Sequence, residues 1–204
     1  MFLTIKNKLL IFKSFLALII LFSGTISASE NKNLTSIGNA DAKITVKVFS
    51  SLSCPHCADF HQKVFYKLKR EFIDKNMVKF EHHSFPLDLR ALNAEKILKC
   101  FDKKEKRLNF LSKVYEKQND WSVGTDINSI NEKLIKIAKN QNLDSGKIDV
   151  CLKDENLEDE ILNERIAGDK KYSITSTPTI LINEKKYEGK HNYEDFKKAI
   201  KKLL

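Results

Sequence analysis

The chain has 204 residues, of which 42% are hydrophobic and 31% are charged, and its formal net charge is +9. Six Gly and three Pro are too few for a collagen-like or low-complexity chain, and four Cys are too few for a small disulfide scaffold. The sequence therefore predicts one compact domain, or one domain that carries an insertion, and excludes a large multi-domain machine.

The N-terminal segment 1–28 is predicted to be a secretory signal peptide. It has a basic start, an apolar run over residues 15–22 and small residues over 23–29, and this order is typical of such signals. Because the apolar run is shorter than the roughly 20 residues that span a membrane, cleavage after Ala28 or Ser29 is favoured over membrane anchoring. A periplasmic location follows, where disulfides form and persist.

Nucleic-acid binding is not predicted, although the chain is basic. Residues 1–28 contain three Lys and no acidic residue, so the mature chain keeps 33 basic against 27 acidic residues and a net charge of +6. The Lys residues are spread along helix faces, and no block of Arg with interleaved aromatic residues occurs. We expect these charges to form a solvated surface.

A strand, a helix and a second strand are predicted over residues 43–85. Lys43–Phe49 alternates β-branched and other side chains as a strand with one buried face does. Met77–Phe85 is the second strand, and it stops at Pro86. The helix between them has an apolar stripe made of Phe60, Val64, Leu68 and Phe72. This βαβ order implies parallel pairing and a right-handed crossover.

Residues 87–172 show only helical apolar stripes, and four or five helices are predicted there. They separate the first half of a sheet domain, residues 29–86, from its second half, residues 173–204. The predicted fold class is α/β, with a split βαβ–ββα sheet and an inserted helical domain.

A β-hairpin is predicted in the second half of the sheet domain. Thr179–Asn183 is its first strand, residues 184–186 are its turn and Tyr187–Gly189 is its second strand. Pro178 enters the first strand, where a missing N–H normally argues against a strand; a cis bond after Thr177 would resolve this conflict. The last helix bears Phe196, Ile200 and Leu203.

Cys54 and Cys57 are the candidate reactive residues. Two thiols at a helix start can close a small ring without unravelling the turn, which suits redox exchange. Pro55 suits the first helical turn, and Ser53 is the expected cap. Free backbone N–H groups and a protonated His56 would favour the thiolate of Cys54. Cys54 is therefore predicted to be the attacking or attacked sulfur and Cys57 the resolving one, in a protein that favours oxidation.

Other roles for these cysteines remain open. They could form an ordinary structural disulfide, or hold Cu(I) or Zn with a nearby His in an exported metal-carrying module. Cys100 and Cys151 stand 51 positions apart, so no second Cys-x-x-Cys completes a four-thiolate zinc site. His82 and His83 are expected to point to opposite faces of their strand, which argues against a shared metal.

The motif Cys54-Pro55-His56-Cys57 after a strand, the run Phe85–Asp88, the helical insertion and Thr177-Pro178-Thr179 before a hairpin resemble the DsbA-like branch of the thioredoxin superfamily. The resemblance covers roughly Ile37–Leu203. It implies a thioredoxin-like sheet and an exported thiol:disulfide oxidoreductase that donates disulfides to newly secreted, cysteine-containing proteins. It also implies a quinone-linked membrane reoxidase similar to DsbB, and no metal or cofactor besides the redox-active disulfide.

The resemblance further assigns roles to single residues. Cys54 is the nucleophile, Cys57 resolves, and Pro178 is a cis proline packed against them. Thr177 would offer backbone groups to a substrate strand. Cys100 and Cys151 resemble an extra disulfide that some bacterial members carry in the insertion, and their expected role is structural.

Three positions depart from the pattern of this family. Val48 stands where a buried acid is frequent, so the group that relays the proton of the resolving thiol is unassigned. His61 occupies a helix position that is often acidic. Thr177, rather than Val, precedes the proline, as in isomerase and reductase relatives. Oxidase activity is predicted, with isomerase or reductase activity as the alternative.

Overall fold

The computed structural model describes residues 34–204. The predicted signal peptide, residues 1–28, lies outside the described residues. Within the described part of the chain, no helix is long and apolar enough to cross a membrane.

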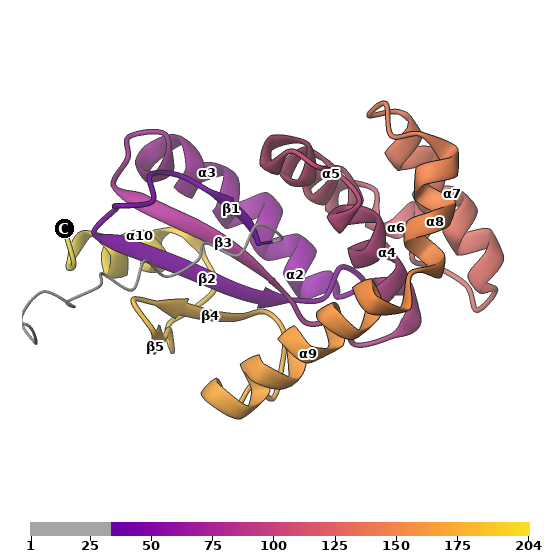
Figure 1. The fold of residues 1–204 in the computed structure, drawn as a ribbon. Coiled ribbons are helices and arrows are strands. Elements are labelled where there is room, and N and C mark those ends of the chain that lie inside the picture. Colours follow the sequence, from indigo (N-terminus) through magenta and orange to yellow (C-terminus); the bar gives the residue numbers. More distant parts are fainter. Residues whose placement is uncertain (1–33) are drawn as a thin grey trace, which may run out of the picture. The chain divides into compact units, whose positions relative to one another are not determined.

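A five-stranded mixed sheet forms the centre of the fold (Figure 1). Its strands lie in the order β1 (Thr35–Ile37), β3 (Val78–Ser84), β2 (Ile44–Ser50), β4 (Thr179–Ile182) and β5 (Lys185–Lys186). Only β2 and β3 pair in parallel, and the other neighbours are antiparallel. The predicted βαβ unit and the thioredoxin-like α/β fold class are therefore confirmed.

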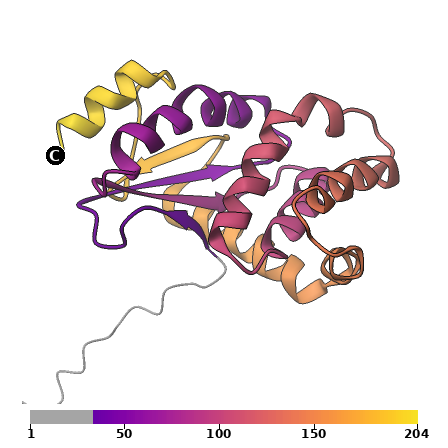
Figure 2. The ribbon, with the colours of Figure 1, turned by 90° about the horizontal axis from the view of Figure 1, so that it is seen from above.

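One helical segment connects β2 to β3 and covers one face of the sheet. It consists of α2 (Pro55–Phe60), the π-helical turn η2 (His61–Phe65), α3 (Tyr66–Leu68) and the π-helical turn η3 (Lys69–Ile73). The predicted apolar stripe is buried, and Phe65 packs on Phe80 of β3 with ring centroids 4.6 Å apart. Helix α10 (Tyr193–Lys201) lies on the same face, where Phe196 meets Phe60 at 5.8 Å (Figure 2).

The first strand was not predicted from the sequence. β1 has only three residues and pairs antiparallel with β3, with Ile37 opposite Phe80. Gly38 follows it with φ +105°, and a Cβ there would lie 2.5 Å from the carbonyl oxygen of Val78. A strand this short carries too little alternation to be recognised, and its turn depends on a glycine that can approach a backbone closely.

Six helices connect β3 to β4. They are α4 (Leu89–Lys99), α5 (Lys104–Glu116), α6 (Gln118–Trp121), α7 (Ile127–Lys139), α8 (Ser145–Lys153) and α9 (Glu155–Tyr172). The predicted number of four or five is too low, because α6 is a single turn with no apolar period of its own. Figure 1 shows α4, α6, α7 and α8 beyond the carboxyl ends of β2 and β3, whereas α5 also packs against β1.

The helices of the insertion share their core with the sheet. Trp121, Phe110 and Ile130 belong to the same contiguous apolar cluster as Val48 of β2 and Phe80 of β3. Four of these helices begin at an Asp whose side chain accepts a backbone N–H, namely Asp88, Asp126, Asp144 and Asp154. The insertion therefore packs as part of one body, and the predicted domain boundaries stay a prediction.

The C-terminal hairpin turns earlier than predicted. Asn183 and Glu184 form the two-residue turn with positive φ angles of 48° and 67°, and β5 begins at Lys185. The predicted turn at 184–186 is therefore wrong. Positive φ at both central positions matches the twist of a hairpin, and the Asn183 side chain accepts a hydrogen bond from Thr45 N at 2.8 Å, which holds the turn against β2.

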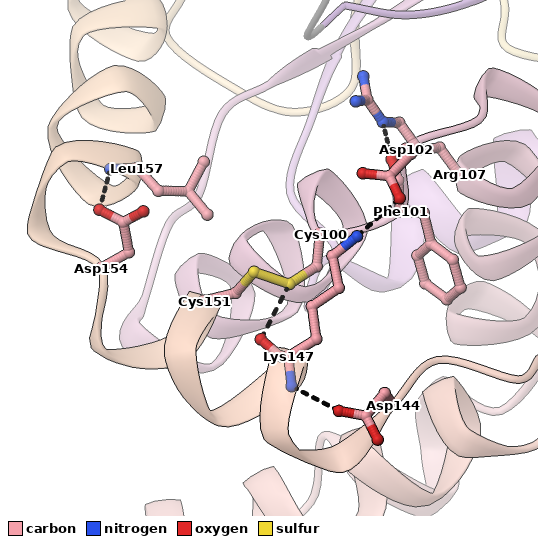
Figure 3. Close-up of a disulfide and its surroundings, with 9 residues drawn as sticks. All are labelled: Cys100, Phe101, Asp102, Arg107, Asp144, Lys147, Cys151, Asp154 and Leu157. Carbon is pink, nitrogen blue, oxygen red and sulfur yellow. Dashed lines mark hydrogen bonds and ion pairs between the residues drawn. A yellow bond between two sulfur atoms is a disulfide. The ribbon is translucent and has the colours of Figure 1, made fainter.

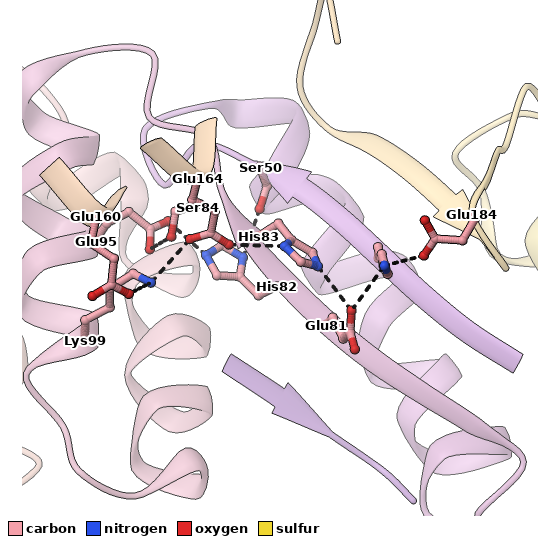
Figure 4. Close-up of polar contacts among 11 residues, drawn as sticks. Ser50, Glu81, His82, His83, Ser84, Glu95, Lys99, Glu160, Glu164 and Glu184 are labelled. Atoms are coloured by element: carbon pink, nitrogen blue, oxygen red, sulfur yellow. Dashed lines mark hydrogen bonds and ion pairs between the residues drawn. The ribbon is translucent and has the colours of Figure 1, made fainter. Parts of the chain in front are cut away.

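Helix α9 crosses the other face of the sheet. The ring of Phe49 on β2 lies so close to Gly168 of α9 that a Cβ there would be 2.6 Å from it. The His83 ring stacks on Phe49 at 4.7 Å and hydrogen-bonds Glu164 of α9 at 3.1 Å and Glu81 at 3.2 Å (Figure 4). This clamp of one imidazole between two carboxylates ties α9 to β3.

The clamp shifts the pKa of all three groups. Burial raises the pKa of Glu81 and of Glu164, but hydrogen bonds from His83, together with Lys79 beside Glu81 and Lys99 beside Glu164, outweigh it and bring each to about 2. Burial lowers the pKa of His83, but the two carboxylates outweigh it and the net shift is upward. The folded state therefore favours a charged imidazole between charged carboxylates.

Cys100 and Cys151 form a disulfide that joins the end of α4 to α8 (Figure 3). Their Cα atoms are 6.1 Å apart, and Cys100 is buried. The Sγ of Cys100 also lies 3.5 Å from the carbonyl oxygen of Lys147. The bond links two helices of the insertion, and we propose that its role is structural.

We predict that replacing both Cys100 and Cys151 with Ser lowers the melting temperature by roughly 10 °C. The bridge closes a loop across 51 positions, for which chain entropy gives at most about 4 kcal/mol. Thermal unfolding monitored by circular dichroism measures the shift, and thiol–disulfide exchange by the same variant should be largely retained. Loss of exchange at an unchanged melting temperature would instead show that this bridge relays electrons.

The His83 clamp predicts a pH-dependent stability. The raised pKa of His83 stabilises the fold fully below its unfolded value of 6.5, and this contribution is lost as pH rises through the raised pKa. The lowered pKa values of Glu81 and Glu164 stabilise the fold fully above pH 4.5. This contribution is lost as the pH falls towards 2. His83→Asn should therefore lower the free energy of unfolding most, by about 3 kcal/mol, between pH 4.5 and pH 6.5.

Urea unfolding at several pH values measures the difference in unfolding free energy between the wild type and this variant. The matched control is His56→Asn, which removes an exposed histidine and should change the unfolding free energy little at any pH. A difference that stays constant from acid to alkaline pH would contradict an ionised clamp.

Candidate active site

The candidate site lies where β2 ends and α2 begins. Cys54 is the N-cap residue of α2, with φ −80° and ψ 120°, and Pro55 is the first helical residue. The carbonyl oxygen of Cys54 accepts the N–H of Cys57 at 3.1 Å. The predicted cap at Ser53 is wrong, because Ser53 stands one residue earlier and its hydroxyl instead donates to Asp88 at 3.0 Å. The chain thus places Cys54 itself at the open end of the helix.

The two thiols differ in their access to solvent. Cys54 and Cys57 are both free thiols; Cys54 is partly exposed, and Cys57 is only 2% exposed. Between them, Pro55 and His56 are exposed. A protein substrate can therefore reach the sulfur of Cys54 but not that of Cys57.

The loop before β4 faces this sulfur. Phe49 pairs with Thr179, which brings the residues before Thr179 to the end of β2. The thiol of Cys54 donates to the carbonyl oxygen of Thr177 at 3.4 Å, and the Thr177–Pro178 bond is cis. The structure therefore gathers the four residues of the Cys-x-x-Cys motif and both residues of the Thr-Pro step at one place.

The environment gives the two sulfurs opposite pKa shifts. A hydrogen bond from the Cys57 thiol is the largest cause that lowers the pKa of Cys54, from 9.0 to about 5, and burial opposes it. The backbone N–H groups of Cys57 and His56 lower it further. His56 thus contributes its backbone N–H, whereas the sequence analysis predicted a contribution from its protonated ring. Burial, and then Cys54 itself, raise the pKa of Cys57 well above 9.0.

This arrangement is chemically competent for thiol–disulfide exchange. A partly exposed thiolate can attack, or be released from, a disulfide, because the thiolate is the reactive form of cysteine. A protonated thiol held beside it can then resolve a mixed disulfide once it loses its proton. The two sulfurs therefore have distinct roles before any substrate binds.

Two contacts that the sequence did not predict hold the active-site loop. The side-chain amide of Gln118 donates to the carbonyl oxygens of Leu52 at 2.8 Å and of Cys54 at 3.0 Å. Asp88, which accepts the Ser53 hydroxyl, also accepts two bonds from Arg90, at 3.2 and 2.7 Å. A single Gln or Asp in a polar stretch carries no sequence signal, so these anchors become visible only in the fold.

The positions that depart from the family pattern are buried. Val48 lies in the apolar core beneath α2. His61 is buried too, its Nε2 lies 3.0 Å from the Ser112 hydroxyl, and burial lowers its pKa to about 3. Neither residue supplies an acid to the cysteines.

His82 and His83 contact separate groups. His82 lies 2.9 Å from Glu95 on α4, whereas His83 belongs to the clamp with α9. Among residues 34–204, no group of three or more His, Cys, Asp and Glu could hold a metal ion. The described residues thus add no third such ligand to Cys54 and Cys57.

Comparisons with known proteins match this geometry. The family model of thioredoxin matches residues 30–202. Disulfide bond formation protein D of Bacillus subtilis is 31% identical over 178 residues, which cover 82% of this chain and 76% of that protein. A Rickettsia bellii relative named for protein-disulfide oxidoreductase activity is 26% identical over 162 residues, which cover 79% of this chain and 61% of that relative. The match thus spans less than two thirds of the Rickettsia protein.

Solved structures resemble the described fold. The crystal structure of Wolbachia pipientis alpha-DsbA1 has a TM-score of 0.77 and 30% sequence identity, covering 84% of this chain and 90% of that one. Oxidised BdbD of Bacillus subtilis has a TM-score of 0.72 and 27% identity, covering 84% of this chain and 93% of that one.

We predict that the thiolate of Cys54 titrates with a midpoint near pH 5. The ultraviolet absorbance of the thiolate in the reduced protein measures this midpoint, and Cys54→Ser should abolish the transition. Because the Cys57 thiol is the largest stabilising donor, Cys57→Ala should move the midpoint upward. A wild-type midpoint near 9.0 would contradict the assigned geometry.

Proposed function

The chain belongs to the thioredoxin family, in its DsbA-like branch of thiol:disulfide oxidoreductases, and on this premise we propose that it is an exported oxidase. It introduces disulfide bonds into newly secreted, cysteine-containing proteins through Cys54 and Cys57. The observation that carries the proposal is the lowered pKa of Cys54 beside a buried, protonated Cys57.

A stabilised thiolate favours the reduced enzyme and so makes its disulfide oxidising. Each pKa unit corresponds to about 1.4 kcal/mol, which is about 30 mV for this two-electron couple. Cys54 is partly exposed, so solvent screens part of this effect. The direction still favours an oxidant over a reductant.

The proposed reaction proceeds by two exchanges. A substrate thiolate attacks the Sγ of Cys54 in the oxidised enzyme, the bond to Cys57 breaks, and the electron pair passes to the Sγ of Cys57, which takes up a proton. A second substrate thiolate then attacks the substrate sulfur of the mixed disulfide. This forms the substrate disulfide and releases Cys54 as a thiolate, which leaves readily because its pKa is low.

The surroundings of Cys54 suit an extended substrate. Thr177 would pair its backbone with the substrate chain, as in strand addition, and Pro178 would pack beside the sulfurs. Pro55 and His56 are exposed between the cysteines and would contact the substrate next to the reacting bond. Backbone pairing of this kind gives affinity without a strong sequence preference.

Reoxidation completes the proposed cycle. The reduced enzyme, with Cys54 and Cys57 as free thiols, would return its electrons to a quinone-linked membrane partner similar to DsbB. Export by cleavage of residues 1–28 would place the enzyme in the periplasm together with its substrates. The redox-active disulfide is the sole group that this cycle requires from the enzyme.

Isomerase or reductase activity is the second candidate, and the identity of Thr177 favours it. Thr precedes the proline in isomerase and reductase relatives, and the Oγ1 of Thr177 is buried without a hydrogen-bond partner. The same two cysteines would then rearrange or reduce disulfides. The reduction potential separates the oxidase from a reductase, and the reactivation of a protein with scrambled disulfides separates it from an isomerase.

The reduction potential of Cys54–Cys57 against glutathione tests the proposal. We predict a potential nearer to that of DsbA, about −120 mV, than to that of thioredoxin, about −270 mV. The oxidised enzyme should also oxidise a reduced, unfolded protein stoichiometrically, and Cys54→Ser should not.

A potential near −270 mV, or faster reactivation of a protein with scrambled disulfides than oxidation of a reduced one, would contradict the oxidase. Metal analysis of the purified protein tests the metal-carrying alternative. A stoichiometric metal that is lost in Cys57→Ser would favour that alternative.

A further inference from the structure

We propose that Gln118 of the helical insertion is a positioning residue for thiol–disulfide exchange at Cys54, an inference that rests on the proposed function. Gln118 begins α6, stands 64 positions from Cys54 along the chain and is only 4% exposed. Its side-chain amide donates to the carbonyl oxygen of Leu52 at 2.8 Å and to that of Cys54 at 3.0 Å. One NH2 group therefore holds the backbone on both sides of Ser53.

The bond to Leu52 satisfies a carbonyl group that has no access to water. Leu52 is 0% exposed and lies in the turn between β2 and α2, outside any helix or strand. A buried carbonyl oxygen without a hydrogen bond is unfavourable. Without the Gln118 amide, the turn would have to shift until this oxygen reached another donor or water. Because Cys54 follows Leu52 by two residues, such a shift would move the reactive cysteine as well.

The bond to Cys54 fixes the residue from which α2 begins. The carbonyl oxygen of Cys54 also accepts the N–H of Cys57 at 3.1 Å and that of Ala58 at 3.2 Å, which are bonds of the first helical turn. The Gln118 amide is a further donor to the same oxygen, and it comes from outside the helix. It therefore orients the start of α2 relative to the insertion, which the bonds within the helix do not do.

The contacts of the Cys54 sulfur depend on this orientation. The thiol lies 3.4 Å from the carbonyl oxygen of Thr177. The thiol of Cys57 and the backbone N–H groups of Cys57 and His56 stabilise its thiolate. Hydrogen bonds weaken as their angle departs from linearity, so a displaced Cys54 would lose part of each of them. Gln118 thus acts on the sulfur through the backbone of Cys54.

The charge distribution of the amide acts in the same direction. A carbonyl oxygen carries partial negative charge, and that of Cys54 belongs to the same residue as the thiolate. The N–H groups of Gln118 carry partial positive charge, and they point at this oxygen and at that of Leu52. They offset part of the negative charge near the sulfur, which favours the thiolate over the thiol.

The short helix α6 gives the amide a fixed support. Trp121, at the other end of α6, is 0% exposed, and its ring N–H donates to the carbonyl oxygen of Val114 on α5 at 2.8 Å. Arg90 of α4 donates to the carbonyl oxygen of Ser122, directly after α6, at 2.6 Å. Gln118 thus projects from a turn that is tied to both α4 and α5, as a precise positioning contact requires.

A second anchor of the loop before α2 should keep the fold intact when Gln118 is replaced. The Ser53 hydroxyl donates to Asp88, the N-cap residue of α4, at 3.0 Å. Asp88 is itself held by Arg90 at 2.7 Å. These bonds do not involve Gln118, so its loss should loosen the position of Cys54 without unfolding the loop.

Gln118→Met tests the proposal, because methionine keeps the length of the side chain and donates no hydrogen bond. The thiolate midpoint of Cys54, measured by the ultraviolet absorbance of the reduced protein, should rise by about one pH unit, which is the effect of losing about one hydrogen bond. The equilibrium constant with glutathione should shift about tenfold towards the oxidised enzyme. This shift corresponds to a reduction potential that is lower by about 30 mV.

Gln118→Asn is the second variant. Asparagine keeps the amide but is shorter by one CH2 group, so it cannot reach both carbonyl oxygens from the same backbone position. The midpoint and the potential should therefore shift in the same direction as in Gln118→Met, and by less. If Gln118→Met does not fold, Gln118→Asn carries the same test.

Gln62→Met is the matched control. The side-chain amide of Gln62 also donates to a backbone carbonyl oxygen, that of Tyr115, at 3.1 Å. This bond links η2 to α5 and does not involve the loop before Cys54. The control removes a bond of the same kind and should leave the midpoint of Cys54 and the reduction potential at their wild-type values.

Thermal unfolding of each variant separates positioning from stability. A purely structural role predicts that Gln118→Met lowers the melting temperature and keeps the wild-type midpoint and potential, and this result would overturn the proposal. Equal shifts of the midpoint in Gln118→Met and Gln62→Met would overturn it as well. A wild-type potential near that of thioredoxin would instead contradict the proposed oxidase, because the role of Gln118 is measured by the difference between variant and wild type.

Discussion

The proposed exchange depends on one asymmetry: the free thiols of Cys54 and Cys57 meet opposite environments. Cys54 stands at the start of α2, where backbone N–H groups have no helical partner and favour negative charge. Cys57, one turn further on, is buried among apolar side chains, where charge is disfavoured. The two environments are coupled, because the protonated thiol of Cys57 donates a hydrogen bond that stabilises the thiolate of Cys54. A single helix start thus places one thiol whose pKa is lowered beside one whose pKa is raised.

The rest of the molecule holds this helix start in place. The sheet brings Thr177 to the sulfur because β4 pairs antiparallel with β2. From the insertion, Gln118 and Asp88 fix the loop before α2 by hydrogen bonds to Cys54 and to Ser53. The hydrogen bond from Ser53 to Asp88 and that from Gln118 to Cys54 each contribute on the order of 1 kcal/mol to the stability of the fold. Their main effect is to fix the position of Cys54.

The sequence predicted what depends on local pattern and missed what depends on distant contacts. The strands around Val48 and Phe80 and the stripe from Phe60 to Phe72 follow from periodicity, because burial of one face leaves a repeat in the chain. The turn at Asn183 was misplaced because its geometry is set by a bond to Thr45, 138 positions away. The partners of Cys54 followed from the motif, whereas Gln118 belongs to the site only through the tertiary fold.

The helical insertion contributes residues that hold the active site and does not only cover it. Val48 supplies no acid to the core that it shares with Cys57, and the buried carboxylate of Glu95 on α4 is joined to β3 through His82. A buried carboxylate without a partner would be costly, and the His82 imidazole and the Ser84 hydroxyl satisfy Glu95 and so fix α4 against β3. The helices inserted between β3 and β4 therefore hold two parts of the sheet domain in place: Gln118 binds the carbonyl oxygen of Cys54, and Glu95 binds His82 near the end of β3.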